Sequence, residues 1–279
     1  MTDKYAVIGN PIAHSKSPQI HKMFAEQTEQ DISYEPIFAE RDDFSATVER
    51  LRKEGYKGCN VTVPFKEDAF QLRAIGRSTS HSEYVDEAKA ANTLKFLDGV
   101  IKVDNTDGVG LVRDLEQNLG VNLNGKRLLL IGAGGAARGV LLPLRRALRQ
   151  ADANITITNR TVDRARHLAR GTNVSICSYE ELAGKSFDIV INATSAGLKD
   201  EMPDIPKTIF APGALAYDLM YGRVTPFMKF AREQGVREDR IKDGLGMLVE
   251  QAAESFRIWR GHDVQLDTSS VIAVLRQQQ

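Results

Sequence analysis

The sequence predicts an α/β fold made of two α/β domains. Strand-like and helix-like segments alternate along most of the 279 residues, which is the pattern of parallel sheets covered by helices. A chain of this length is expected to form about two domains, at roughly 150 residues each. A hairpin signal near residues 93–103 interrupts the alternation, and a second α/β series follows it.

The first series of elements predicts a mainly parallel sheet, because strand–helix–strand crossovers join parallel strands. Ser17 followed by Pro18 is typical of an N-cap and a first helical residue. Gly55 is a plausible C-terminal glycine for a second helix. The expected strands cover residues 5–9, 33–39 and 57–63, and the expected helices cover 18–27 and 42–55.

Residues 93–103 predict a β-hairpin. Asp98-Gly99 stands at the centre of alternating residues, as in two-residue hairpin turns. If these two residues form the turn, Asn92 faces Asn105, and Asp107 lies just beyond the same end. The hairpin therefore predicts that Asn92 and Asp107 are close in space.

The second series begins near Thr106. Residues 127–132, RLLLIG, are a continuous apolar run, as expected for a central parallel strand. Thr225-Pro226 opens a helix that Gly235 closes. The other expected strands cover residues 154–159, 188–192 and 214–221, and the other expected helices cover 136–150, 162–169, 245–260 and a segment after Thr268.

Composition excludes several classes of protein. The net charge is zero, with 37 basic and 37 acidic residues, which argues against a nucleic-acid partner. Cys59 and Cys177 are isolated and are expected to be reduced, buried thiols of a cytoplasmic protein. There is no signal-peptide pattern and no apolar run of the roughly 18 residues that span a membrane. No histidine or cysteine spacing indicates a metal site.

A glycine-rich turn predicts a dinucleotide site in the second domain. Residues Gly132, Ala133, Gly134, Gly135, Ala136 and Ala137 match G-x-G-x-x-A directly after a buried strand and at the start of a helix. This is the context of the Rossmann-like fold, in which the backbone approaches a pyrophosphate at the helix N-terminus. The alternative is a glycine-rich turn without a ligand.

The end of the next strand favours NADP as the cofactor. NAD sites usually carry an acidic residue there, bonded to the ribose 2′-hydroxyl. This chain instead has Asn159, Arg160 and Thr161, with Arg164 four residues beyond Arg160. Two guanidinium groups are suited to a 2′-phosphate. The alternative for both arginines is a solvated helix start.

Polar residues on the strand at 57–63 suggest a second ligand site. Asn60 and Thr62 alternate with valines and so share one face of the strand. Lys66 follows the strand, after a proline. Lys66 alone would be interpreted as a surface lysine.

Together these motifs resemble the shikimate dehydrogenase family. The segments run in the family's order and span nearly the whole chain: NPIAHSKSP (10–18), NVTVPFK (60–66), DNTDGVG (104–110), GAGGAARG (132–139), NRT (159–161), NATSAG (192–197), YDLMY (217–221) and DGLGMLVEQAA (243–253). The resemblance implies interconversion of 3-dehydroshikimate and shikimate with NADP, in the pathway to aromatic amino acids.

The resemblance also implies roles for individual residues. Lys66 would be the catalytic acid or base, paired with Asp107, since a lysine ammonium can stabilise and protonate a developing alkoxide. The substrate carboxylate would be bound by Ser15, Ser17 and Thr62, and the ring hydroxyls by Asn60, Asn92, Asp107 and Gln251, with Tyr221 also at the substrate. The cofactor would contact residues 132–136, 159–164, Leu219 and Gly244.

Simpler structural roles compete with several of these assignments. Ser17 would serve as an N-cap, Asp107 as a turn or helix cap, Gln251 as the border of an apolar stripe, and Tyr221 as a core residue. The segment between Lys66 and Asn92 departs from the family pattern: it is several residues longer, and Lys89 stands where a glycine is frequent. Glu83, inside this segment, is a candidate cofactor contact.

The resemblance implies a substrate-binding domain of residues 1–105 completed by helices in 244–279, and a Rossmann-like NADP domain of residues 106–243. The active site would lie in the cleft between them, in a monomer or homodimer. Two other functions remain open: a quinate/shikimate dehydrogenase with broader cofactor use, and a catalytically silent NADP-binding regulator. Lys66 and Asp107 argue against the regulator.

Overall fold

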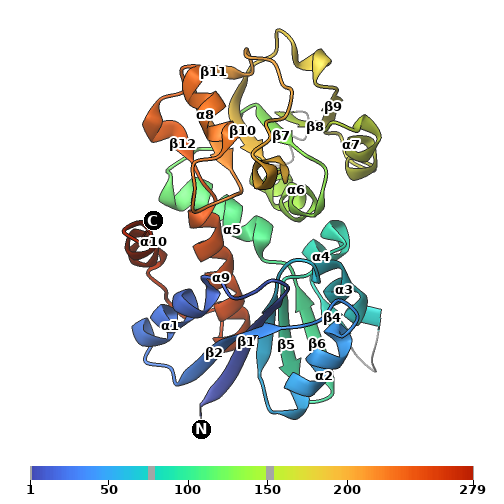
Figure 1. Cartoon of the computed structure of the whole chain (residues 1–279), viewed down its shortest axis with the longest axis vertical. Helices are drawn as coiled ribbons and strands as arrows, with labels where there is room; N and C mark the ends of the chain where they lie inside the picture. The colour runs from blue at the N-terminus through green and yellow to red at the C-terminus, as the bar shows by residue number, and fades with distance from the viewer. Residues whose placement is uncertain (1, 75–78, 149–153, 279) are drawn as a thin grey trace. The chain divides into compact units, whose positions relative to one another are not determined.

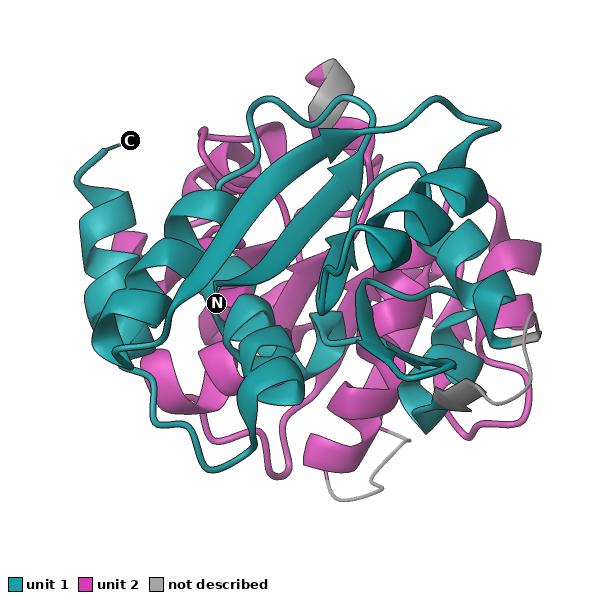
Figure 2. Ribbon diagram, turned by 90° about the horizontal axis from the view of Figure 1, so that it is seen from below, with its two compact units in different colours: residues 1–110, 248–278 teal, residues 111–247, 279 magenta. Residues whose placement is uncertain are grey.

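The computed structural model describes residues 2–74, 79–148 and 154–278. The chain forms two compact units (Figure 2). Unit 1 contains residues 1–110 and 248–278, and unit 2 contains residues 111–247. These divisions fall inside helices α5 (Asp107–Arg113) and α9 (Leu245–Arg260), whereas the expected boundaries at 105/106 and 243/244 lie just before those helices.

Unit 1 is built on a six-stranded sheet of order β2-β1-β3-β5-β6-β4 (Figure 1). Strand β1 pairs in parallel with β2 and with β3, as the crossover rule predicts. Strand β5 is antiparallel to both β3 and β6, and β4 is parallel to β6. The strands are β1 (Asp3–Gly9), β2 (Ile32–Phe38), β3 (Gly58–Val61), β4 (Thr79–His81), β5 (Thr93–Leu97) and β6 (Val100–Asp104).

The predicted hairpin is confirmed with its register. Leu97 pairs with Val100 and Thr93 with Asp104, so Asp98 and Gly99 are the two turn residues. Gly99 has a φ of 72°, a left-handed conformation that glycine adopts without strain. Strand β4 was not predicted, because only three residues of it pair.

Most helices of unit 1 begin and end close to their predicted positions. Gly55 has a φ of 83° after α2, which confirms it as a C-terminal glycine. The N-cap prediction for Ser17 is wrong: Lys16 occupies the N-cap position and Ser17 is already helical, with no side-chain cap hydrogen bond. The helices are α1 (Ser17–Gln27), α2 (Phe44–Lys53), α3 (Lys66–Gln71), α4 (Glu83–Ala88), α5, α9 and α10 (Thr268–Arg276).

Unit 2 has a fully parallel sheet of order β12-β11-β10-β7-β8-β9. The order reverses at β7, which is the doubly wound arrangement of nucleotide-binding folds. The predicted N-cap Thr225 accepts a hydrogen bond from the backbone N–H of Met228. The strands are β7 (Leu128–Ile131), β8 (Ile155–Thr158), β9 (Ser175–Cys177), β10 (Phe187–Asn192), β11 (Phe210–Asp218) and β12 (Ile241–Lys242), and the helices are α6 (Gly135–Ala147), α7 (Val162–Leu168) and α8 (Pro226–Glu233). The end of the expected helix at 149–150 lies outside the described residues.

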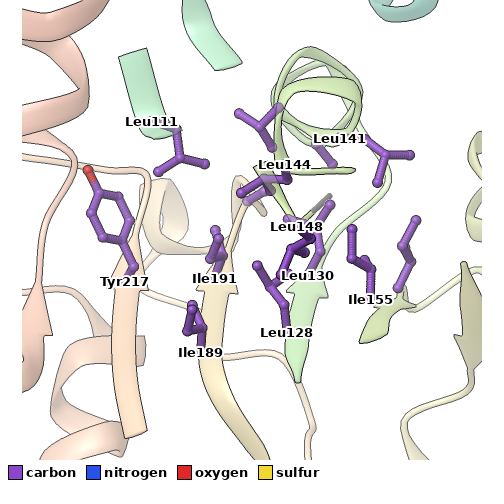
Figure 3. Close-up of a cluster of buried hydrophobic side chains, with 14 of the residues drawn as sticks. Leu111, Leu128, Leu130, Leu141, Leu144, Leu148, Ile155, Ile189, Ile191 and Tyr217 are labelled. Atoms are coloured by element: carbon purple, nitrogen blue, oxygen red, sulfur yellow. The ribbon is translucent and has the colours of Figure 1, made fainter. Parts of the chain in front are cut away.

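Leucine and isoleucine side chains from the central strands fill the core of unit 2 (Figure 3). Every side chain of β7 is fully buried, which explains why this strand reads as a continuous apolar run. Packing on both faces fixes the sheet beneath the glycine-rich turn. Among the helices of the described residues, none is long and apolar enough to cross a membrane.

Candidate functional site

Lys66 and Asp107 form an ion pair in unit 1. Lys66 begins α3 and Asp107 begins α5, so both side chains project from helix starts that follow strands of the same sheet. Lys66 Nζ lies 2.6 Å from Asp107 Oδ2, with 30% of the lysine side chain and 12% of the aspartate side chain exposed. A partly exposed, hydrogen-bonded ammonium has the position needed to exchange a proton with a bound ligand.

Asn92 fixes the other oxygen of this carboxylate. Its Nδ2 donates to Asp107 Oδ1 at 2.9 Å, as the hairpin register predicts. Its Oδ1 accepts the backbone N–H of Thr106 at 2.9 Å, so the amide can face Asp107 only with its NH₂ group. Asp107 therefore receives Asn92 on one oxygen and Lys66 on the other.

Gln251 joins the same cluster from α9. Its Oε1 accepts a hydrogen bond from Asn92 Nδ2 at 3.1 Å, and its Nε2 donates to the Leu248 carbonyl at 2.8 Å. A Cβ on Gly110 would overlap the Gln251 backbone, so the close approach of α5 to α9 requires glycine there. Gln251 thus does more than border an apolar stripe.

The three residues expected at a substrate carboxylate lie on two segments of unit 1. Ser15 Oγ accepts the backbone N–H of Ser17 at 3.3 Å, so it stabilises the turn into α1. Ser17 is 9% exposed. Thr62 directly follows β3, and its backbone N–H donates to the Ile8 carbonyl at 2.9 Å. Among the described residues, no hydrogen bond joins these three to Lys66 or Asp107.

Asn60 is held by protein groups on both sides of its amide. Its Oδ1 accepts from Tyr34 Oη at 2.8 Å and from His21 Nε2 at 3.2 Å. Its Nδ2 donates to the Asn92 carbonyl at 3.1 Å and to Ser255 Oγ at 3.0 Å. With 6% of the residue exposed, Asn60 links β3 to β5 and α9.

His21 is a member of this cluster that lies outside every motif considered in the sequence. It is fully buried and stacks on Tyr34, with ring centroids 4.2 Å apart. Burial lowers the pKa of His21 to about 3. A sequence signal existed: His21 falls on the buried stripe of α1, whose members are Ser17, Ile20, His21, Phe24 and Ala25, at helical spacing.

The glycine-rich turn of unit 2 has the shape of a phosphate cradle. Gly132 has a φ of 114°, and a Cβ there would lie 3.0 Å from the Ala193 carbonyl oxygen, so the fold itself requires glycine. Gly134 is the N-cap of α6 and Gly135 its first residue. A Cβ on either would meet no atom within 4 Å. The chain's own packing does not require glycine at these two positions, whereas a pyrophosphate against the α6 N-terminus does.

The end of β8 offers positive charge to a ligand. Arg160, Thr161 and Arg164 are exposed, and Asn159 Nδ2 donates to the Thr161 carbonyl at 2.8 Å. Asp163, the acid nearest to them in the sequence among the described residues, pairs with Arg166 at 2.7 Å. The residues present therefore suit an anionic 2′-phosphate better than a 2′-hydroxyl.

Leu219 and Gly244 are in contact within unit 2. A Cβ on Gly244 would overlap the Leu219 carbonyl oxygen, so close packing against Leu219 is enough to require glycine at this position. Tyr221 is 37% exposed, so it is no core residue. Glu83 lies in the first turn of α4, in unit 1. Residues 75–78 of the segment that departs from the family pattern lie outside the described residues.

No group of three or more histidine, cysteine or acidic side chains within the described ranges could hold a metal ion.

Comparison with known proteins gives the same family along the chain. Residues 7–94 match the shikimate dehydrogenase substrate binding domain, residues 114–199 the shikimate/quinate 5-dehydrogenase family, and residues 244–268 the shikimate 5′-dehydrogenase C-terminal domain. A shikimate dehydrogenase (NADP(+)) of Methylobacillus flagellatus is 53% identical, over 98% of this chain and 99% of that protein.

Two solved structures agree over almost the whole chain. An Ael1 enzyme from Pseudomonas putida has a TM-score of 0.90 at 48% identity, over 98% of both chains. The shikimate 5-dehydrogenase of Thermus thermophilus, in complex with NADP(H) and shikimate, has a TM-score of 0.84 at 30% identity, over 99% of both chains. With its motifs, fold and relatives in agreement, the chain belongs to the shikimate dehydrogenase family.

Proposed function

We propose that this protein reversibly reduces 3-dehydroshikimate to shikimate with NADPH, in the biosynthesis of aromatic amino acids. The observation that carries the proposal is the Lys66–Asp107 pair, with Nζ and Oδ2 2.6 Å apart and Asn92 on the second carboxylate oxygen. A catalytically silent relative has no need of a charged, partly exposed pair held in this way at the starts of the helices that follow β3 and β6. The names of the relatives, shikimate dehydrogenase (NADP(+)), support the choice of cofactor.

Lys66 acts as the general acid in the direction of reduction. When bound, NADPH supplies the hydride that the carbonyl carbon receives. Negative charge then develops on the carbonyl oxygen, and the Lys66 ammonium stabilises it and gives up one proton to form the hydroxyl. In the oxidation of shikimate, the same nitrogen takes the hydroxyl proton as the hydride leaves the carbon.

Asp107 holds the lysine in place and presents its carboxylate to substrate hydroxyls. Its two oxygens are oriented by Asn92 and Lys66, so little reorganisation is needed when a ligand arrives. We assign Ser15, Ser17 and Thr62 to the substrate carboxylate. Asn92, Gln251 and Tyr221 are assigned to the rest of the substrate. Asn60 is held by protein partners, which favours a supporting role for it.

The cofactor is assigned to unit 2. Gly132, Ala133, Gly134, Gly135 and Ala136 would hold the pyrophosphate, and Asn159, Arg160, Thr161 and Arg164 the 2′-phosphate. Leu219 and Gly244 would contact the remainder, with Glu83 as a further candidate contact. The support is the glycine cradle at the α6 N-terminus and the exposed arginines after β8.

A spectrophotometric assay at about 340 nm tests the proposal, because reduced nicotinamide absorbs there. Shikimate and quinate are each combined with NADP⁺ and with NAD⁺. The expected result is the highest kcat/KM for shikimate with NADP⁺. Preference for quinate would support the alternative function of a quinate/shikimate dehydrogenase, which agrees with the name of the family that residues 114–199 match. Binding of NADP⁺ without turnover of either substrate would support a silent regulator.

A further inference from the structure

Asp218, the last residue of β11, is a buried carboxylate to which no role has been given. It is fully buried, and within the described ranges no lysine, arginine or histidine forms an ion pair with it. Its Oδ1 accepts the backbone N–H of Met220 at 3.0 Å. Its Oδ2 accepts Thr225 Oγ1–H at 2.6 Å and Asn192 Nδ2–H at 3.1 Å. Burial raises the pKa of this carboxyl group.

The neighbours of Asp218 are oriented so that only an acceptor fits between them. Thr225 Oγ1 already accepts the Met228 N–H at 3.3 Å as the N-cap of α8, so its single proton is directed at Asp218. Asn192 Oδ1 accepts both the N–H and the hydroxyl of Thr194, at 3.2 and 2.8 Å. The NH₂ group of Asn192 must therefore face Asp218.

These hydrogen bonds hold two loops at the carboxyl end of the sheet. Met220 and Thr225 stand near the two ends of the segment 219–225, which contains Tyr221. Through Asn192, the same carboxylate is joined to the loop that follows β10. A Cβ on Gly197 would lie 2.7 Å from Met220 Sδ, so the two loops also pack directly against each other.

The strand order shows which part of a dinucleotide these loops would meet. The arginines follow β8, on one side of β7, while β10 and β11 lie on its other side. In such sheets the ligand crosses the switch point at the carboxyl ends of the strands. With the 2′-phosphate at Arg160 and the pyrophosphate at the α6 N-terminus, the nicotinamide half is directed toward β10 and β11.

We propose that Asp218 is a positioning residue for the nicotinamide half of the NADP site, acting through the loops 193–197 and 219–225. This inference rests on the proposed cofactor. Because Asp218 is fully buried, it would touch neither the substrate nor the cofactor. It holds the backbone of the loop that carries Leu219 and Tyr221. The adenosine half, bound by the α6 turn and the arginines, does not depend on it.

Binding measurements distinguish contacts to the nicotinamide half of the cofactor from contacts to its adenosine half, and they require no turnover. Isothermal titration measures Kd for NADP⁺ and for 2′,5′-ADP, which carries the 2′-phosphate but no nicotinamide. Asp218→Asn keeps the shape, but in either orientation of the amide its NH₂ group faces hydrogen-bond donors: the Met220 N–H in one, and the Thr225 hydroxyl and the Asn192 NH₂ in the other. Thr225→Val removes the hydroxyl proton, and Thr225→Ser retains it. Arg160→Ala is the reciprocal control, because it should weaken both ligands.

The expected result is at least a ten-fold weaker NADP⁺ affinity, about 1.4 kcal/mol, in Asp218→Asn and Thr225→Val. Affinity for 2′,5′-ADP should be unchanged in both, which also shows that unit 2 is folded, and Thr225→Ser should restore NADP⁺ binding. Equal losses for both ligands, or unchanged NADP⁺ affinity, would overturn the inference. The proposed cofactor is tested separately, by whether the unaltered protein binds NADP⁺ more tightly than NAD⁺.

Discussion

Acidification should destabilise unit 1 through His21. Asn60 Oδ1 can only accept hydrogen bonds, so the Nε2 of His21 carries the proton. The other ring nitrogen, Nδ1, is buried without a hydrogen-bond partner among the described residues. A second proton at Nδ1 would place an uncompensated charge in the core, and this is why burial lowers the pKa of His21 from 6.5 to about 3.

The sign and size of the effect follow from linkage. Because the folded pKa is depressed, the unfolded chain binds more protons between pH 6.5 and about 3. The contribution to stability is fully present above pH 6.5 and is lost as the pH falls toward 3. Between pH 7 and pH 5 the free energy of unfolding should fall by ~2 kcal/mol from this residue alone.

Urea unfolding at pH 7, 6 and 5 measures this loss. The protein's one tryptophan, Trp259, is a suitable fluorescent probe, since its ring centroid lies 5.2 Å from that of His21. His21→Phe keeps an aromatic ring against Tyr34, and His21→Gln keeps a donor for Asn60. Both should be less stable than the unaltered protein at pH 7.

The informative quantity is the difference between pH 7 and pH 5, in which the packing loss of each variant cancels. Both variants should lose ~2 kcal/mol less than the unaltered protein over this range. His262→Gln, at an exposed histidine, controls for removal of a histidine as such. A pH dependence of the His21 variants parallel to that of the unaltered protein would refute the reasoning.

Four further predictions concern the proposed site and the segment beside it. Lys66→Ala should lower kcat by ~10²–10⁴-fold with a smaller change in KM; if the Lys66 and Asp107 losses multiply in the double alanine variant, the two do not act as a unit. Arg160→Ala should weaken NADP⁺ binding by about ten- to a hundred-fold and spare NAD⁺; equal losses in titration would contradict a phosphate contact. Ser15→Ala should raise KM for shikimate and also lower the melting temperature slightly, because Ser15 Oγ accepts a backbone N–H; an unchanged KM would exclude the carboxylate contact. Lys89, with a φ of 50°, occupies a left-handed position, so Lys89→Gly should raise the free energy of unfolding by up to about 1 kcal/mol; a loss of stability in urea would contradict this.

Local chemistry determined much of the fold. The Asp98-Gly99 turn sets the register of its own hairpin, so the approach of Asn92 to Asp107 could be predicted by counting residues. The helix 245–260 has the predicted bounds, because its apolar spacing and its closing glycine are features of a single segment. The glycine-rich turn and the arginines after the next strand are likewise contiguous in sequence, and they indicated the cofactor.

Only the tertiary structure decided which polar groups share partners. The sequence predicts one strand that carries both Asn60 and Thr62, but β3 ends at Val61, and Asn60 is bonded to Tyr34, His21 and Ser255, residues distant in sequence that packing brings to it. The capping prediction for Ser17 was wrong because the helix starts one residue earlier than the sequence suggests and Ser15 stabilises the turn. In the sequence, Asp218 cannot be distinguished from any other acidic residue at the end of a strand. Only the folded sheet shows that Asn192 lies beside it and donates a hydrogen bond to it. A buried polar side chain is defined by the donors and acceptors around it, and those come from segments whose meeting depends on the whole fold.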